Sequence, residues 1–96
     1  MVAIYQNAIG INMTIYTAFN ITGYSSVVLY IKKPDGTLLT KTPTVVSETT
    51  GELSYVTLTG DLDQAGDYTA QAVVNFTDGD VAKGELDPFV IYTPIV

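Results

Sequence analysis

The chain has 96 residues, enough for one domain and too few for two. Ten acidic residues outnumber four lysines, there is no arginine, and the net charge is −6, so the chain lacks the clustered cations that nucleic acids and anionic membranes attract. It also has no Cys and no His, which excludes a disulfide framework, a thiolate or imidazole metal site, a Cys nucleophile and a Ser-His-Asp triad. We expect a single domain over 1–96, non-enzymatic, with no metal, no cofactor, and neither nucleic acid nor membrane as partner.

The chain is unusually apolar for a soluble monomer. Hydrophobic residues make up 47% and charged residues 15%, and the mean hydropathy is +0.28. A typical domain carries about 25% charged residues. We therefore expect neighbouring subunits to cover part of the apolar surface. No apolar run approaches the ~20 residues that span a bilayer. The N-terminus lacks a basic region followed by an apolar one, so we expect a complete small protein without a signal peptide.

Alternation of apolar and polar side chains predicts strands in chain order, because successive side chains of a strand point to opposite faces. The first runs through 12–19. The second, 26–32, is partly apolar on both faces, as in a central strand. A third signal is the β-rich run 55–58. The clearest is 67–76, whose apolar face consists of Tyr68, Ala70, Ala72, Val74 and Phe76.

The last strand is predicted over 81–92 with an interruption at Pro88, which cannot donate to a ladder. Turn-forming residues separate the predicted strands at 20–23, 34–36, 50–52 and 78–80. About seven short strands at this spacing are typical of two packed sheets. The predicted fold is all-β, an immunoglobulin-like, two-sheet antiparallel β-sandwich.

The segment 61–68 places acidic residues, then Gly66, then Tyr68 at the start of the strongest strand. Immunoglobulin-like domains have such a corner before their F strand, where a Tyr hydroxyl bonds to upstream backbone and a Cys follows two residues later. Here Ala70 takes that Cys position. We assign Tyr68 and Gly66 a structural role in this corner.

Many of the acidic residues fall in predicted turns, where Asp is favoured because its side chain bonds to nearby backbone. A pair of catalytic carboxylates, as in glycoside hydrolases, is the weaker interpretation. Calcium is the better functional alternative, because Asp61/Asp63 and Asp78/Asp80 are closely spaced carboxylates. Neither pair belongs to an EF-hand pattern, and the turn interpretation is favoured.

Five residues are candidates for an interaction surface: Tyr5, Tyr16, Tyr30, Ile95 and Val96. Tyr16 and Tyr30 lie opposite the presumed core residues of their strands and are candidates for an outward aromatic patch, since Tyr combines apolar area with a polar tip. The segments 1–5 and 92–96 are apolar and uncharged, unlike most free ends. We expect both ends to be strands attached to the sandwich, or to dock on neighbouring subunits.

Two segments carry a family resemblance. One is a strand that ends in Lys32-Lys33-Pro34-Asp35-Gly36, and the other is Ala65-Gly66-Asp67-Tyr68 followed by a strand that ends in Asp78-Gly79. Over roughly 10–92 the chain resembles the N-terminal domain of the upper baseplate protein of siphophages and similar small phage proteins. In the larger proteins this domain anchors to the tail, while a following helix and C-terminal module carry the receptor-binding proteins. Because the sequence stops at Val96, we expect that arm to be absent and the anchoring module alone to remain.

The resemblance implies a non-enzymatic structural subunit of a tailed bacteriophage virion, in the baseplate or tail, the neck, or the capsid surface. Its partners would be other virion proteins and copies of itself, its location the virion, and its assembly site the bacterial cytoplasm. A small-molecule ligand is not expected. The alternative is a carbohydrate- or cell-surface-binding immunoglobulin-like module that uses exposed Tyr residues.

Overall fold

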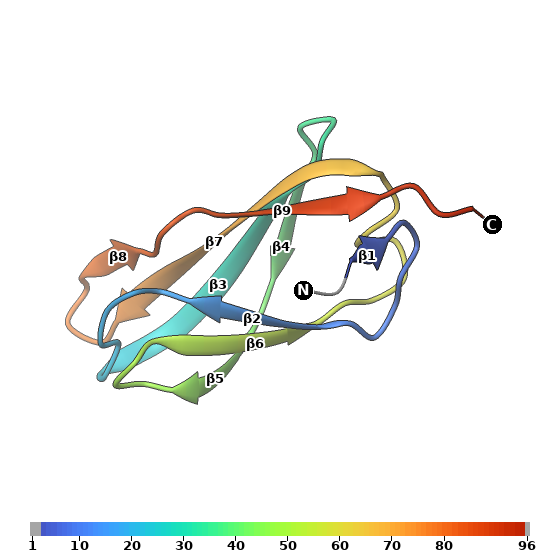
Figure 1. Ribbon diagram of the computed structural model, residues 1–96. Coiled ribbons are helices and arrows are strands. Elements are labelled where there is room, and N and C mark those ends of the chain that lie inside the picture. The colour runs from blue at the N-terminus through green and yellow to red at the C-terminus, as the bar shows by residue number, and fades with distance from the viewer. Residues whose placement is uncertain (1–2, 96) are drawn as a thin grey trace.

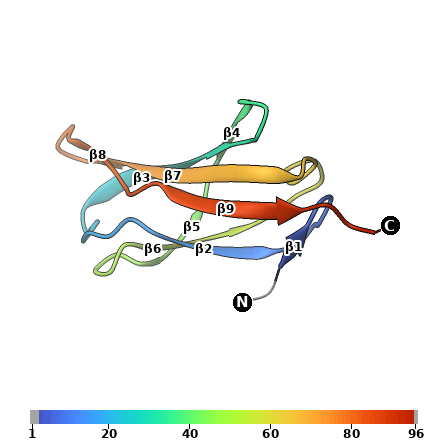
Figure 2. The ribbon, with the colours of Figure 1, turned by 45° about the horizontal axis from the view of Figure 1, so that its top comes forward.

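The structure, a computed structural model, describes residues 3–95, and every regular element in that range is a β-strand. Nine strands form two sheets that pack face to face, as Figure 1 and, from another angle, Figure 2 show. The all-β sandwich predicted from the alternation is therefore confirmed. No helix capable of crossing a membrane occurs within 3–95.

The larger sheet, here sheet A, has the strand order β1-β9-β7-β3-β4, with β8 also paired to β7. Its strands are β1 (Ile4–Tyr5), β3 (Tyr24–Lys32), β4 (Leu38–Lys41), β7 (Gly66–Phe76), β8 (Val81–Lys83) and β9 (Asp87–Tyr92). Sheet B has the order β2-β6-β5, formed by β2 (Asn12–Tyr16), β5 (Thr44–Ser47) and β6 (Glu52–Val56). The sets β2-β6-β5 and β9-β7-β3 match the B-E-D and G-F-C strands of an immunoglobulin domain.

The core consists of the inward side chains of both sheets. Along β7 the alternation places Tyr68, Ala70, Ala72 and Val74 in the interior, as the sequence predicts. The inward residues of the neighbouring strands complete the cluster, among them Ile15, Leu29, Ile31, Leu53 and Ile91. The alternation of apolar and polar residues in the sequence thus gives each strand one buried face and one outward face.

The alternation of side chains does not by itself predict β1 or β5, although the apolar segment 1–5 is expected to be either a strand or a docking segment. The strand β1 has only two residues, and it pairs in parallel with β9 through Ile4–Ile91 and Tyr5–Tyr92, so the sandwich is not wholly antiparallel. The strand β5 follows Pro43, where the chain crosses from sheet A to sheet B. Both are too short for a periodic signal, and their pairing partners lie far away in sequence.

The strand predicted over 81–92 is interrupted, but at Gly84 rather than at Pro88. Both β8 and β9 pair with β7, and the N–H of Gly84 donates to the Ala72 carbonyl at 2.8 Å between them. Pro88 lies within β9, opposite Thr69, where β1 does not extend along the other side. An open edge tolerates a residue without N–H, and this is why Pro88 does not end the strand.

Candidate functional site

The tyrosine corner lies where the chain enters β7. The Tyr68 hydroxyl donates to the Gln64 carbonyl at 2.7 Å and accepts from the Gln64 N–H at 3.1 Å. The ring is fully buried and stacks on Phe89 with centroids 5.2 Å apart. Gly66 has φ +130°, and a Cβ there would lie 3.0 Å from Pro34 Cγ. Burial raises the pKa of Tyr68, so the hydroxyl stays protonated as a donor. The corner is a structural device.

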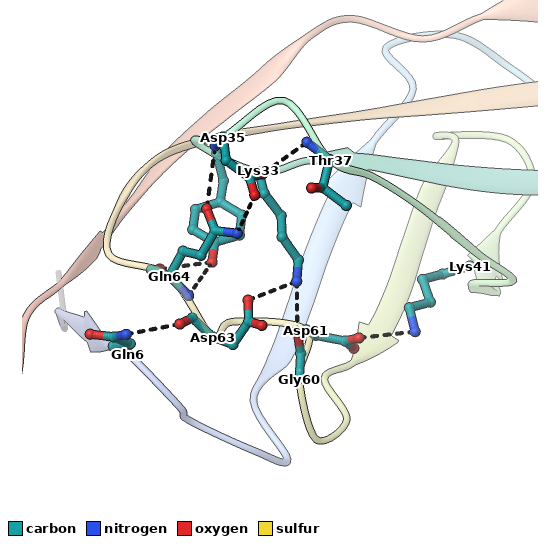
Figure 3. Close-up of polar contacts among 10 residues, drawn as sticks. Gln6, Lys33, Asp35, Thr37, Lys41, Gly60, Asp61, Asp63 and Gln64 are labelled. Carbon is teal, nitrogen blue, oxygen red and sulfur yellow. Dashed lines mark hydrogen bonds and ion pairs between the residues drawn. The ribbon is translucent and has the colours of Figure 1, made fainter.

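The loop between β6 and β7 is held by side chains from the turn after β3 (Figure 3). The Lys33 ammonium donates to Asp63 Oδ1 at 2.7 Å and to the Gly60 carbonyl at 2.9 Å, although Lys33 is itself buried. The Gln64 amide donates to Asp35 Oδ2 at 2.8 Å. A buried lysine needs partners of this kind because its desolvation is otherwise uncompensated.

Asp61 is the buried carboxylate of the same loop. Its Oδ1 lies 2.9 Å from Lys41 Nζ, and its Oδ2 accepts from the Tyr55 hydroxyl at 2.5 Å and from the Leu58 N–H at 2.8 Å. Burial alone would raise the pKa of Asp61. The hydrogen bonds from Tyr55, the Leu58 N–H and Lys41 outweigh it and hold the pKa below 3.8. The carboxylate is therefore ionised and fully engaged in the fold.

Three of the four carboxylates considered for calcium make polar contacts of this kind. Asp61 and Asp63 are each neutralised by a lysine, and Asp78 Oδ1 accepts the N–H of Asp80 within the β7–β8 turn. In the described range, no three His, Cys, Asp or Glu side chains are arranged to hold a metal ion. The acidic residues of these loops are thus engaged in turns and ion pairs.

The outer face of sheet A carries an apolar surface. The side chains opposite the core alternate along β3 and β7, and the register places Val28 beside Val73 and Tyr30 beside Gln71. On the flanking strands Leu38, Val90 and Tyr92 also lie on this face, with 57%, 45% and 50% of their area exposed. An apolar face of this extent, with little charge, is typical of a contact surface.

A shallow hollow of about 320 Å³ lies in this face. It is lined by Tyr30, Lys32, Leu38, Thr69, Gln71 and Leu86, which come from β3, β4, β7 and the β8–β9 link. The Gln71 amide donates to the Gly84 carbonyl at 2.9 Å, which fixes that side chain at the edge of the hollow. The hollow is large enough for one or two protruding side chains of a partner.

The four lysines divide into two pairs with different roles. Lys33 and Lys41 are committed to ion pairs inside the loop network, whereas Lys32 and Lys83 make none within residues 3–95. Both of the latter belong to the outer face of sheet A, because Lys32 is paired with Thr69 and Lys83 with Val73. Although the chain has a net charge of −6, this face presents two cations, with Asp67 toward its β9 side.

The outer face of sheet B is different. Its side chains are mostly polar, namely Asn12, Thr14, Thr44, Glu52 and Ser54, with Tyr16, Val46 and Val56 among them. Tyr16 is 56% exposed on this face, and Tyr30 lies on the opposite face of the molecule. The two do not form one aromatic patch, because β2 and β3, although consecutive, belong to different sheets.

The first and last strands of the described chain pair at one end of the sandwich, where Figure 1 shows β1 beside the end of β9. Tyr5 and Tyr92 are neighbours there, with ring centroids 6.2 Å apart, and both are about half exposed. Ile95 lies beyond β9 and is fully exposed. Val96, the remaining candidate, lies outside the described residues. Tyr5 and Tyr92 thus extend the outer face of sheet A, while Ile95 lies past its end.

Sequence reasoning singled out Tyr30 but not its neighbours in the hollow. The alternation of β3 already places Lys32 on the side of Tyr30, which is a usable signal. Leu38, Thr69, Gln71 and Leu86 come from three other segments, and only the strand register brings them together.

Comparison with known proteins identifies a fold and no family. No protein-family model matches the chain, and no curated protein matches it. Among solved structures it is similar to CopC from Methylosinus trichosporium OB3b, with a TM-score of 0.59, 15% sequence identity, and coverage of 96% of this chain and 86% of CopC. At this identity the likeness shows the β-sandwich fold alone.

Proposed function

We propose that this chain is a non-enzymatic structural subunit of a tailed bacteriophage virion that docks on another virion protein through the outer face of sheet A. The observation that carries the docking role is the composition of that face. It has exposed apolar side chains, a hollow lined by Tyr30, Leu38 and Leu86 together with polar groups, and two lysines that make no ion pair within residues 3–95. The virion context rests on the sequence resemblance over 10–92. Baseplate or tail, neck and capsid surface are the candidate positions.

The charge of the face defines the chemistry of its partner. A surface that docks here buries Tyr30 and Leu38, and it approaches Lys32 and Lys83. An ammonium group buried without a counter-charge is destabilising. The partner is therefore a protein surface with an apolar side chain that enters the hollow and carboxylates placed to meet the lysines. Such charge pairs contribute to specificity and to the rate of association.

Mass spectrometry of purified particles, from the phage that encodes the chain, tests the virion assignment. The subunit should be present in stoichiometric amounts. A chain that is absent from the particle overturns the assignment, whatever its docking surface.

A matched pair of variants tests the surface. Leu38→Ser removes an exposed apolar side chain beside the hollow, and Val46→Ser removes one of similar exposure, 56%, from the sheet B side. Leu38→Ser should lower incorporation into particles several-fold, and Val46→Ser should not. Lys32→Glu should act like Leu38→Ser, because it replaces attraction with repulsion. Equal incorporation of all three overturns docking through sheet A.

The second candidate is a carbohydrate- or cell-surface-binding module, favoured by one feature of the hollow. A tyrosine ring, a fixed amide and a hydroxyl lie together there as Tyr30, Gln71 and Thr69. Aromatic stacking with polar groups beside it suits a sugar ring. A glycan array with the purified chain tests this candidate, with Tyr30→Ser as the control that should abolish any signal. A blank array leaves protein docking as the function.

A further inference from the structure

Sheet B ends in an unpaired strand on the side of β2. Its strand order is β2-β6-β5, so β2 is paired with β6 alone. In immunoglobulin sheets of the A-B-E-D type a strand A covers this edge. Here the strand that precedes β2 is β1, which pairs with β9 in sheet A. The position beside β2 is therefore not filled by the described chain.

Hydrogen bonds at both ends of β2 show which residues face the open edge. The Thr57 N–H donates to the Ile11 carbonyl at 3.0 Å, and the Thr17 N–H donates to the Gly51 carbonyl at 2.9 Å. The hydrogen-bonding direction of a strand alternates from residue to residue, and the β2–β6 register is continuous. Asn12, Thr14 and Tyr16 consequently point their N–H and C=O groups away from β6.

The β2 edge lacks the features that keep edge strands from pairing, which are charges, Pro, bulges and very short length. The other sheet edges within 3–95 have them. The pairing of β5 shifts register between Val45 and Ser47, β4 ends in Lys41, β8 contains Lys83, β9 contains Pro88, and β1 has two residues. In contrast, β2 reads Asn-Met-Thr-Ile-Tyr, regular and uncharged.

We propose that the β2 edges of two copies of this chain pair antiparallel about a twofold axis at Thr14, which joins the two B sheets into one. In this register Asn12 of one copy faces Tyr16 of the other, and Thr14 faces its own counterpart. The backbone N–H and C=O groups of all these residues point toward the open edge. The hydrogen-bonding pattern of the edge is therefore complementary to itself in an antiparallel pair. The proposal concerns a different surface from the docking face of sheet A and does not depend on it.

The uncharged β2 edge is compatible with a second copy as the occupant. Each copy has a net charge of −6, which opposes association at long range. The β2 edge itself has no charge, so no like charges are brought into contact at the pairs 12–16 and 14–14. The residual repulsion between the acidic bodies is screened by salt. Dimerisation should therefore strengthen between low and physiological ionic strength.

Because position 14 faces itself across the axis, charge substitution gives a direct test. Thr14 is exposed, so Thr14→Lys and Thr14→Glu should both fold. Sedimentation equilibrium should show a dimer for the unsubstituted chain and about tenfold weaker dimers for each variant alone, since like charges then meet at the axis. An equimolar mixture of the two variants should recover the affinity as a heterodimer. Thr44→Lys and Thr44→Glu, on the β5 edge of the same sheet, are the matched controls and should dimerise like the unsubstituted chain.

Hydrogen exchange on the unsubstituted chain is a second measurement that needs no variant. The amide protons of Asn12, Thr14 and Tyr16 should exchange quickly in dilute solution and become protected as concentration rises. A chain that stays monomeric at high concentration overturns the proposal. So does a dimer that both Thr14 variants leave intact, a mixture that fails to recover the affinity, or protection of these three amides that is independent of concentration.

Discussion

The hydroxyl of Tyr55 donates to the buried carboxylate of Asp61 at 2.5 Å, and the ammonium of Lys41 lies 2.9 Å from the other oxygen of that carboxylate. Tyr55 comes from β6 of sheet B, and Lys41 ends β4 of sheet A. One carboxylate thus joins the edge of one sheet to the centre of the other. The three groups are partly shielded from water. The loss of one of them therefore leaves the charges or hydrogen-bonding groups of the others without a partner.

Asp61→Asn should destabilise the fold by about 2–4 kcal/mol, because it leaves Lys41 without its counter-charge and replaces one acceptor with a donor. Asp63→Asn is the matched control. Asp63 also pairs with a lysine, but 46% of its side chain is exposed and the buried Lys33 keeps the Gly60 carbonyl as a partner, so its substitution should cost less than that of Asp61, about 1 kcal/mol. Urea unfolding of both variants measures the difference. If both variants lost a similar free energy of unfolding, the larger contribution assigned to Asp61 would be wrong.

Acid should weaken the fold through the same carboxylate. The folded-state pKa of Asp61 is below 3.8, so between that pKa and 3.8 the unfolded chain binds more protons than the folded one. The stabilisation is complete above this window and is lost as the pH falls through it. Asp61→Asn should flatten this part of the stability–pH curve, measured by urea midpoints from pH 2 to 6. A smaller dependence of stability on pH should remain in this variant, because the pKa of Asp35 is also lowered in the folded chain.

Alkaline pH should act on the other two members of the cluster. The hydrogen bond to Asp61 raises the pKa of Lys41 above 10.5, and burial raises the pKa of Tyr55 above 10.0. In both cases the folded chain retains a proton that the unfolded chain has lost. Stability should therefore be constant up to about pH 9.5 and fall as the pH rises through the folded-state pKa values. Lys41→Met, measured by urea midpoints over pH 8–11, should reduce that fall.

Tyr68→Phe should lower the free energy of unfolding by about 1–3 kcal/mol, because the Gln64 N–H and carbonyl both lose their partner at the corner. Tyr16→Phe is the control, since Tyr16 is exposed on the outer face of sheet B. Its effect should stay within about 0.5 kcal/mol. Equal midpoints for the two variants in thermal unfolding would mean that the corner contributes nothing measurable.

Gly51→Ala should be among the most damaging single-methyl changes in the chain. Gly51 has φ +73°, and a Cβ there would lie 1.9 Å from Thr17 Oγ1 and 2.3 Å from the Phe19 carbonyl oxygen. Gly79 has φ +95° but open space around it, so Gly79→Ala isolates the backbone cost of about 1 kcal/mol. Calorimetry should show a clearly lower Tm for Gly51→Ala than for Gly79→Ala. Similar Tm values for the two variants would mean that the contact at Gly51 is relieved at little cost.

Lys33→Met should loosen the loop between β6 and β7 while leaving the sheets intact. Lys33 donates to Gly60 and Asp63, two positions in that loop, and Met keeps the apolar stem without the donor. Hydrogen exchange over 59–65 should accelerate, with little change in the amides of β3 and β7. Unaltered exchange in this loop would show that the corner around Tyr68 suffices to hold it.

The alternation of side chains was sufficient for the fold class. Of the predicted inward face of β7, Tyr68, Ala70, Ala72 and Val74 are buried, and Phe76, at the end of the strand, is partly buried against the core. The two-residue strand β1 and the short β5 gave no periodic signal, since they are defined by partners distant in the chain. The interruption near the C-terminus was expected at Pro88 and lies at Gly84, because the open edge of β9 tolerates proline.

The candidate surface could be anticipated only in part. That Tyr16 and Tyr30 both point outward is local information, available from the neighbours of each. That they lie on opposite faces depends on which sheet β2 and β3 join, which is set by pairing over many residues. For the lysines, alternation along β3 already places Lys32 on the outward side with Tyr30. The partner of the buried Lys33 is set only when the loop carrying Asp63 folds over the turn after β3.

By itself, then, the sequence determined a cysteine-free, histidine-free, acidic chain of alternating strands, since composition and side-chain period are local properties. The tertiary structure decided which lysines are neutralised, which outward side chains share a face, and which edge of sheet B stays open. These are relations between segments far apart in the chain, and only the collective packing of the two sheets brings them together.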